Sequence, residues 1–131
     1  MNKILSIKEM DYDVFEEGVK QIYIGYRIKA EHTEVNILIN TERSCCEKFG
    51  YMASEDNLEY FIGAEIISVS VVSKGNKKLV SALKSLEDDN HKFKAEFVEF
   101  KTSKGVFQIA VYNAHNGYYS HDIIISITGK L

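Results

Sequence analysis

Residues 22–39 read IYIGYRIKAEHTEVNILI, and this stretch decides the fold class. Apolar side chains recur at every second position on both sides of the polar turn at 30–32. They are Ile22, Ile24, Tyr26 and Ile28 before the turn and Val35, Ile37 and Ile39 after it. Such alternation is typical of strands that bury one face, so the stretch predicts an antiparallel hairpin.

The same period of two continues towards the C-terminus. It predicts strands at about 65–73, 93–97, 107–111 and 123–127, and in the first of these Ile67, Val69 and Val71 share the expected buried face. The second and third of them are joined by residues 102–105. This segment is polar and contains Gly105, which is suited to a positive φ, so it predicts a turn. Together with the first hairpin, these segments predict an antiparallel sheet of five to six strands.

Two segments break the alternation and predict short helices. The first begins at Ser54, a residue type favoured at the N-cap, and ends at Gly63. The second is centred on 79–86, where apolar residues recur at helical spacing. Residues 8–20 lack a clear period, and both a helix and an irregular segment remain open there. The predicted fold class is α+β, a mainly antiparallel sheet of five to six strands with two short helices on one face.

Composition limits the possible function classes. The 131 residues are 45% hydrophobic and 27% charged, which predicts one globular domain spanning 1–131. A net charge of −3 and only two arginines, Arg27 and Arg43, argue against non-specific nucleic-acid binding. The sequence has neither an apolar run of membrane-spanning length nor the h-region of a signal peptide, so we expect a cytoplasmic protein with no membrane partner.

The segment at 112–121, YNAHNGYYSH, is unusually dense in hydrogen-bonding and aromatic side chains. The Asn116–Gly117 pair favours a turn, and a hairpin whose aromatic residues pack across its strands is one open interpretation. The other is a recognition loop, in which tyrosine rings stack on a ligand and carboxamides read its hydrogen-bonding edge. The predicted ligand-binding residues here are Asn113, His115, Asn116, Tyr118, Tyr119 and His121.

A second polar segment lies at 41–50, TERSCCEKFG, and adds Arg43, Cys45 and Cys46 to the predicted ligand-binding residues. Adjacent cysteines cannot close a long disulfide loop, and we expect both to be reduced, with at least one buried as a small apolar residue. Two alternatives remain open. One is zinc held by both cysteines with His115 and His121, although structural sites usually separate paired cysteines by two or more residues. The other is a cysteine nucleophile with His115 or His121 as its base.

Three motifs occur in a fixed order: CCE-x-FG at 45–50, FIGAE at 61–65 and YNxHNGYYSH at 112–121. In these motifs the chain resembles a family of small, uncharacterised proteins encoded by phages and prophages of Gram-positive bacteria. The resemblance runs from about residue 35 to residue 121 and brings no established activity. It implies an accessory protein, and such proteins commonly bind and block or sequester host molecules, including nucleotide signals of host immunity.

The predicted function is therefore a non-enzymatic accessory binding protein, an inhibitor of host defence that sequesters a nucleotide-like ligand or blocks a host protein. No metal and no cofactor is predicted. The alternative is a metal- or thiol-dependent enzyme that uses Cys45 or Cys46 with His115 or His121. We expect the two polar segments to converge within side-chain reach. We also expect a homo-oligomer, because apolar strands without proline leave sheet edges that must be protected or paired.

Overall fold

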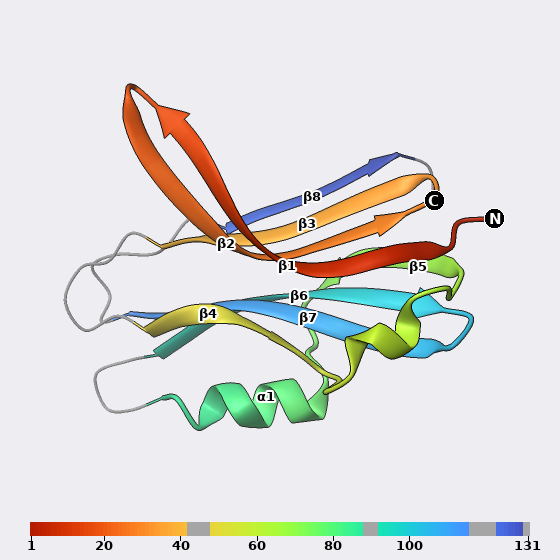
Figure 1. Ribbon diagram of the computed structural model, residues 1–131. Helices are drawn as coiled ribbons and strands as arrows, with labels where there is room; N and C mark the ends of the chain where they lie inside the picture. Colours follow the sequence, from red (N-terminus) through yellow and green to blue (C-terminus); the bar gives the residue numbers. More distant parts are fainter. Residues whose placement is uncertain (42–47, 88–91, 116–122, 130–131) are drawn as a thin grey trace.

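The computed structural model describes residues 1–41, 48–87, 92–115 and 123–129. These residues form two four-stranded antiparallel sheets, one above the other in Figure 1. The first sheet has the order β1-β2-β3-β8, with β1 at Ile4–Glu16, β2 at Val19–Ala30, β3 at Thr33–Asn40 and β8 at Ile123–Gly129. The second has the order β4-β7-β6-β5, with β4 at Lys48–Ala53, β7 at Gly105–His115, β6 at Lys92–Thr102 and β5 at Ile66–Val72.

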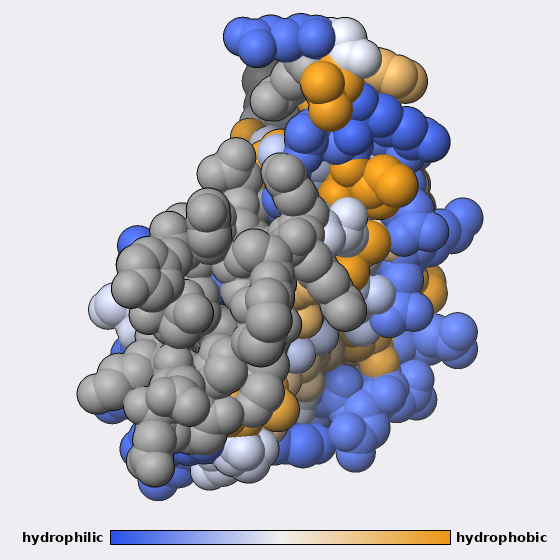
Figure 2. Space-filling view, turned by 90° about the vertical axis from the view of Figure 1, so that its left-hand side faces the viewer, coloured by the Kyte–Doolittle hydropathy of each residue, from blue (hydrophilic) through white to orange (hydrophobic). Residues whose placement is uncertain are grey.

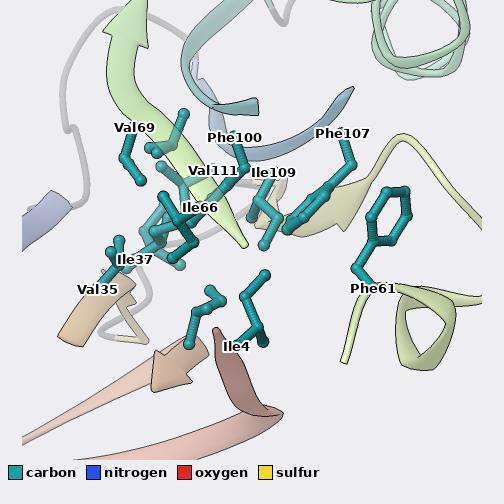
Figure 3. Packing of buried hydrophobic residues seen from close by; sticks show 13 residues of the cluster. Ile4, Val35, Ile37, Phe61, Ile66, Val69, Phe100, Phe107, Ile109 and Val111 are labelled. Atoms are coloured by element: carbon teal, nitrogen blue, oxygen red, sulfur yellow. The ribbon is translucent and has the colours of Figure 1, made fainter. Parts of the chain in front are cut away.

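The inner faces of the two sheets share one hydrophobic core (Figure 3). The rings of Phe100 and Phe107 stack with their centroids 4.6 Å apart. Phe61, from the 3-10 turn η1 (Leu58–Phe61), packs on Phe107 at 4.5 Å. Among the core residues from both sheets with at most 1% exposure are Ile4, Ile28, Val35, Ile37, Ile39, Val98, Ile109 and Val111. Because this apolar surface is buried between the sheets, its transfer from water holds them together.

A second apolar cluster covers the outer face of the second sheet, which is the lower one in Figure 1. The helix α1 (Lys77–Lys84) places Leu79 and Leu83 against Phe97 and Ala110. The helix begins at Asn76, whose side chain accepts a hydrogen bond from the backbone N–H of Lys78 at 2.8 Å. The middle of β6 and of β7 is therefore buried on both faces, with Val98 and Ile109 on the inner side and Phe97 and Ala110 on the outer side.

The far ends of β1 and β2 form a two-stranded ribbon that projects beyond the rest of the first sheet (Figure 1). Its turn has positive φ at both central residues, 50° at Glu17 and 78° at Gly18, as a two-residue hairpin loop requires. Lys20 and Asp13 form an ion pair across the ribbon at 3.3 Å. Phe15 and Val19 lie mostly exposed near the tip, at the top of Figure 2, where apolar and polar surface alternate.

The predicted α+β fold class is wrong. The described strands form two sheets instead of one, with one α-helix and one 3-10 turn. The expected helix from Ser54 to Gly63 is reduced to the four residues of η1, because Ser54 is used elsewhere. Its hydroxyl accepts from the backbone N–H of Gln108 at 2.9 Å, and its own N–H donates to the Gln108 carbonyl, also at 2.9 Å. Both of these bonds attach Ser54 to β7.

Residues 8–20 are neither a helix nor an irregular segment, the two states left open for them. They form most of β1, the ribbon turn and the start of β2. Strand β4 was not predicted at all. The predicted buried face of 65–73 is also wrong in part, because a register shift between Ile66 and Ser68 turns Ile67 outward, with 66% of its surface exposed. Val71, also expected on that face, is 52% exposed, and the buried residues of β5 are Ile66 and Val69.

The other predicted elements are confirmed. The hairpin in 22–39 is β2 and β3, and the pair joined at 102–105 is β6 and β7. The second predicted helix is α1, with its leucines buried as expected, and the last predicted strand is β8. Local periodicity and tertiary burial agree in these elements with two kinds of exception. Ile22 and Ile127 are 40% and 38% exposed, and in β6 both faces carry buried residues, with Val98 and Phe100 opposite to Phe97.

Candidate functional site

Two connections cross between the sheets at the same end of the molecule. One joins β3 to β4 and the other joins β7 to β8. Because β3 is the neighbour of β8 and β4 is the neighbour of β7, four adjacent strand ends meet there, at the left of Figure 1. The two polar segments of the sequence, 41–50 and 112–121, lie in these connections and in the strand ends beside them.

The structure describes only part of the predicted binding set. Asn113 and His115 lie at the C-terminal end of β7. The other predicted residues lie outside the described residues: Arg43, Cys45, Cys46, Asn116, Tyr118, Tyr119 and His121. The reduced state of the cysteines and the enzymatic alternative, which depend on these residues, therefore stay predictions.

The β4–β7 ladder brings the two polar segments together. It pairs Phe49 with Asn113 and Lys48 with Ala114. Directly opposite residues of an antiparallel pair have Cβ atoms about 4.5–5.5 Å apart, so the expected convergence is confirmed for the described ends of the segments. A hairpin formed by the two flanking strands is ruled out, because β7 and β8 belong to different sheets. The Asn116–Gly117 pair itself lies outside the described residues.

Asn113 is the most unusual polar residue at this end. It lies on the same face of β7 as Phe107, Ile109 and Val111, which is the face that contributes to the core. Only 2% of its surface is exposed, and its Oδ1 has no hydrogen-bond partner among the residues that the structure describes. Leaving a buried acceptor unpaired costs about 1–3 kcal/mol, so a hydrogen-bond donor placed at this oxygen would stabilise the fold.

Solvent reaches the inner face of the sheet next to Asn113. The β6–β7 ladder pairs Asn113 with Lys94 and Val111 with Glu96. Opposite residues share a face, so Lys94 and Glu96 also point towards the side of the other sheet, yet both are exposed. The buried Asn113 therefore has the exposed Lys94 as its cross-strand neighbour, at the end of the sandwich where the two polar segments lie.

Part of the sequence motifs has a structural role. Gly50 pairs with Tyr112, and a Cβ at position 50 would lie 2.8 Å from the Tyr112 hydroxyl oxygen. Glycine here leaves room for the tyrosine side chain on the face that carries α1. Burial raises the pKa of the Tyr112 phenol. The FG and YN parts of the motifs are thus cross-strand partners that fix the register beside the site.

Sequence reasoning missed a second group of polar and aromatic residues, at the edge where β1 and β4 approach each other. The Tyr51 hydroxyl donates to Glu9 Oε1 at 3.1 Å, and the Tyr26 and Tyr51 rings meet edge to face at 5.2 Å. A hollow of about 380 Å³ beside them is lined by Ile7, Glu9, Tyr26 and residues 55–59. The group could not be predicted because neither β4 nor the strand state of residues 8–13 was predicted.

Tyr51 predicts a specific alkaline sensitivity. Burial, followed by the bond to Glu9 and its charge, raises the Tyr51 pKa from 10.0 to about 12. The folded state therefore favours the neutral phenol. The contribution of the neutral Tyr51 phenol to stability is complete below pH 10.0 and is lost as the pH rises to about 12. Across this window, the free energy of unfolding should fall more steeply for the wild type than for Tyr51→Phe. The control is Tyr12→Phe at an exposed tyrosine, and equal slopes for wild type and Tyr51→Phe would contradict the assignment.

Within 1–41, 48–87, 92–115 and 123–129, no group of three or more His, Cys, Asp or Glu side chains is arranged to hold a metal ion. No helix in this part of the chain is long and apolar enough to cross a membrane.

Two antiparallel sheets around one core, with two connections that cross between them at one end, define an all-β sandwich. The chain belongs to the family described as Domain of unknown function (DUF7448), whose model matches residues 3–125. This match includes both polar segments and the β4–β7 ladder between them. No curated protein and no solved structure matches the chain.

Proposed function

We propose that this protein is a non-enzymatic binding protein that holds a nucleotide-like ligand at the end of the sandwich where the two polar segments lie. The observation that carries the proposal is the buried Oδ1 of Asn113, which has no partner among the described residues. A ligand that donates a hydrogen bond to this oxygen removes the cost of leaving it unpaired. Binding energy gained in this way requires a hydrogen-bond donor at one position of the ligand. It therefore favours specific binding of one class of ligand over non-specific association.

The chemistry around Asn113 supports a nucleotide-like ligand. An exocyclic amine of a nucleobase is a donor that fits the amide oxygen, and the exposed Lys94 on the neighbouring strand offers a cation for a phosphate. The predicted loop residues Tyr118, Tyr119 and Asn116 would add stacking and further hydrogen bonds. Arg43 in the other crossing segment would add a second cation.

The resemblance to phage and prophage proteins supports a role in blocking host defence. In this role the protein sequesters a nucleotide signal and needs no catalytic group. The other mode of action named above, blocking a host protein, would take its place if no nucleotide binds.

The decisive variant is Asn113→Leu, which keeps the shape of the side chain and removes its polar atoms. If the unpaired oxygen serves a ligand, the free energy of unfolding should stay the same or rise by up to about 1 kcal/mol. Affinity for the ligand should fall at least about tenfold. Calorimetry with linear and cyclic adenine and guanine nucleotides, together with urea unfolding, measures both effects on one protein.

The matched control is Asn36→Leu on the outer face of the first sheet. Asn36 Oδ1 accepts from Arg27 Nε at 2.8 Å, and its Nδ2 donates to Ser126 Oγ at 3.4 Å, so its amide is paired. This variant should lose stability and keep full binding. The proposal fails if Asn113→Leu binds like the wild type, or if none of the nucleotides binds the wild type more tightly than about 1 mM.

A further inference from the structure

Strand β8 forms one edge of the first sheet. It pairs with β3 from Ile39–Ile123 to Thr33–Gly129, and no other described strand pairs with it. Its sequence, IIISITG, contains no charge and no proline. Ile123 and Ile125 face the core and are half-buried, and the next residue on that face, Ile127, is 38% exposed. Within the part of the chain that the structure describes, this edge therefore has no strand partner, and it lies next to apolar side chains that are only partly covered.

The other sheet edges carry features that discourage pairing with a second chain. Strand β1 has five charged residues along its length, and β4 begins with a lysine. Strand β5 has a register shift near its start. Charges, bulges and inward-facing lysines are the devices by which sheet edges avoid association. Among the described edges, β8 is the one without any of them.

We propose that β8 pairs antiparallel with β8 of a second copy of this chain, so that the two first sheets join into one continuous sheet. A two-fold axis at Ser126 pairs all seven residues of the strand. It places Ile125 opposite the partner's Ile127 on the core-facing side. Isoleucine pairs across a ladder stabilise a sheet, and an interface of this kind closes after two copies.

The sequence of β8 favours a second copy over an unrelated strand. When the strand is reversed about Ser126, its isoleucine-rich inner face again lies opposite apolar or small residues. The net charge of −3 produces no direct repulsion at this contact, because the strand itself is uncharged. The proposal does not rest on the ligand site, because it uses only the free edge of β8 and its sequence, whereas the described residues of that site, Asn113 and Lys94, lie on β7 and β6.

Sedimentation at tens of micromolar should show a dimer for the wild type. Ile127→Lys places an inward-pointing lysine at the edge, where a long side chain still reaches solvent. It should raise the dimer dissociation constant at least about tenfold without unfolding the protein. The matched control is Val106→Lys, at a residue of β7 that is 50% exposed, which should remain dimeric.

A second variant gives a readout that does not depend on the folding of Ile127→Lys. Ser126→Cys puts a thiol on the proposed two-fold axis, and mild oxidation should link the two copies, whereas wild type treated in parallel should not be linked through this strand. A monomeric wild type overturns the proposal. So does a dimer that Ile127→Lys leaves intact and that Ser126→Cys fails to link.

Discussion

Gly25→Ala should cost more than about 3 kcal/mol of unfolding free energy, or prevent folding altogether. Gly25 pairs with Met10 on one side and with Leu38 on the other, so it lies between two strands of the first sheet. Its φ is +155°, and a Cβ at this position would overlap the backbone carbonyl oxygen of Ile37. Ile37 is fully buried in β3, so its backbone cannot retreat without breaking the ladder that joins β2 to β3. Urea unfolding followed by circular dichroism measures the loss.

Gly18→Ala is the matched control for this prediction. Gly18 also has a positive φ, +78°, but nothing lies within 4 Å of the position that a Cβ would take. The substitution should cost only the left-handed backbone conformation, about 1–2 kcal/mol. If both alanine variants lost the same stability, the close approach of β2 to β3 would not be the reason for glycine at position 25.

Phe107→Ala should lower the free energy of unfolding by about 3–5 kcal/mol. Phe107 is 1% exposed and contacts both Phe100 and Phe61 through its ring. Its removal leaves a cavity between the sheets and takes away the aromatic contact that holds η1 against the core. Thermal and urea unfolding of the purified variant test the size of the effect.

The control for Phe107 is Phe15→Ala, which deletes the same side chain where it is 71% exposed. Little packing is lost there, so stability should change by less than about 0.5 kcal/mol. A large loss at Phe15 would mean that the ribbon contributes to the global stability of the fold. A small loss at Phe107 would contradict the shared core.

Local periodicity predicted the strands whose two faces differ in burial. In β2, β3, β7 and β8 the alternating residues belong to the core or pack against it, except Ile22 and Ile127, which are exposed. It failed for 8–20, because a ribbon that extends past the core has solvent on both faces and needs no alternation. It also could not separate one sheet from two, since alternation reports that a face is buried but not what covers it.

The site was predictable only as a concentration of polar residues. The density of side chains in 112–121 pointed to Asn113. The burial of its amide and the position of Lys94 beside it follow from the β6–β7 ladder and from the cover of the other sheet. These contacts join residues far apart in the chain, so no local pattern contains them. The same applies to Glu9 and Tyr51, which are 42 residues apart.

The projecting ribbon implies a gradient of local stability along two continuous strands. Near Ile4 and Ile28, opening β1 and β2 exposes core, and their amides should exchange with solvent only when the whole domain unfolds. Beyond Tyr23, the last residue of β2 towards the tip that pairs with β3, the strands β1 and β2 have only each other as strand partners among the described residues, and a two-stranded ribbon is marginally stable in water. The tip therefore opens and closes while the sandwich stays folded, and changes in its sequence or length can accumulate there without reaching the core.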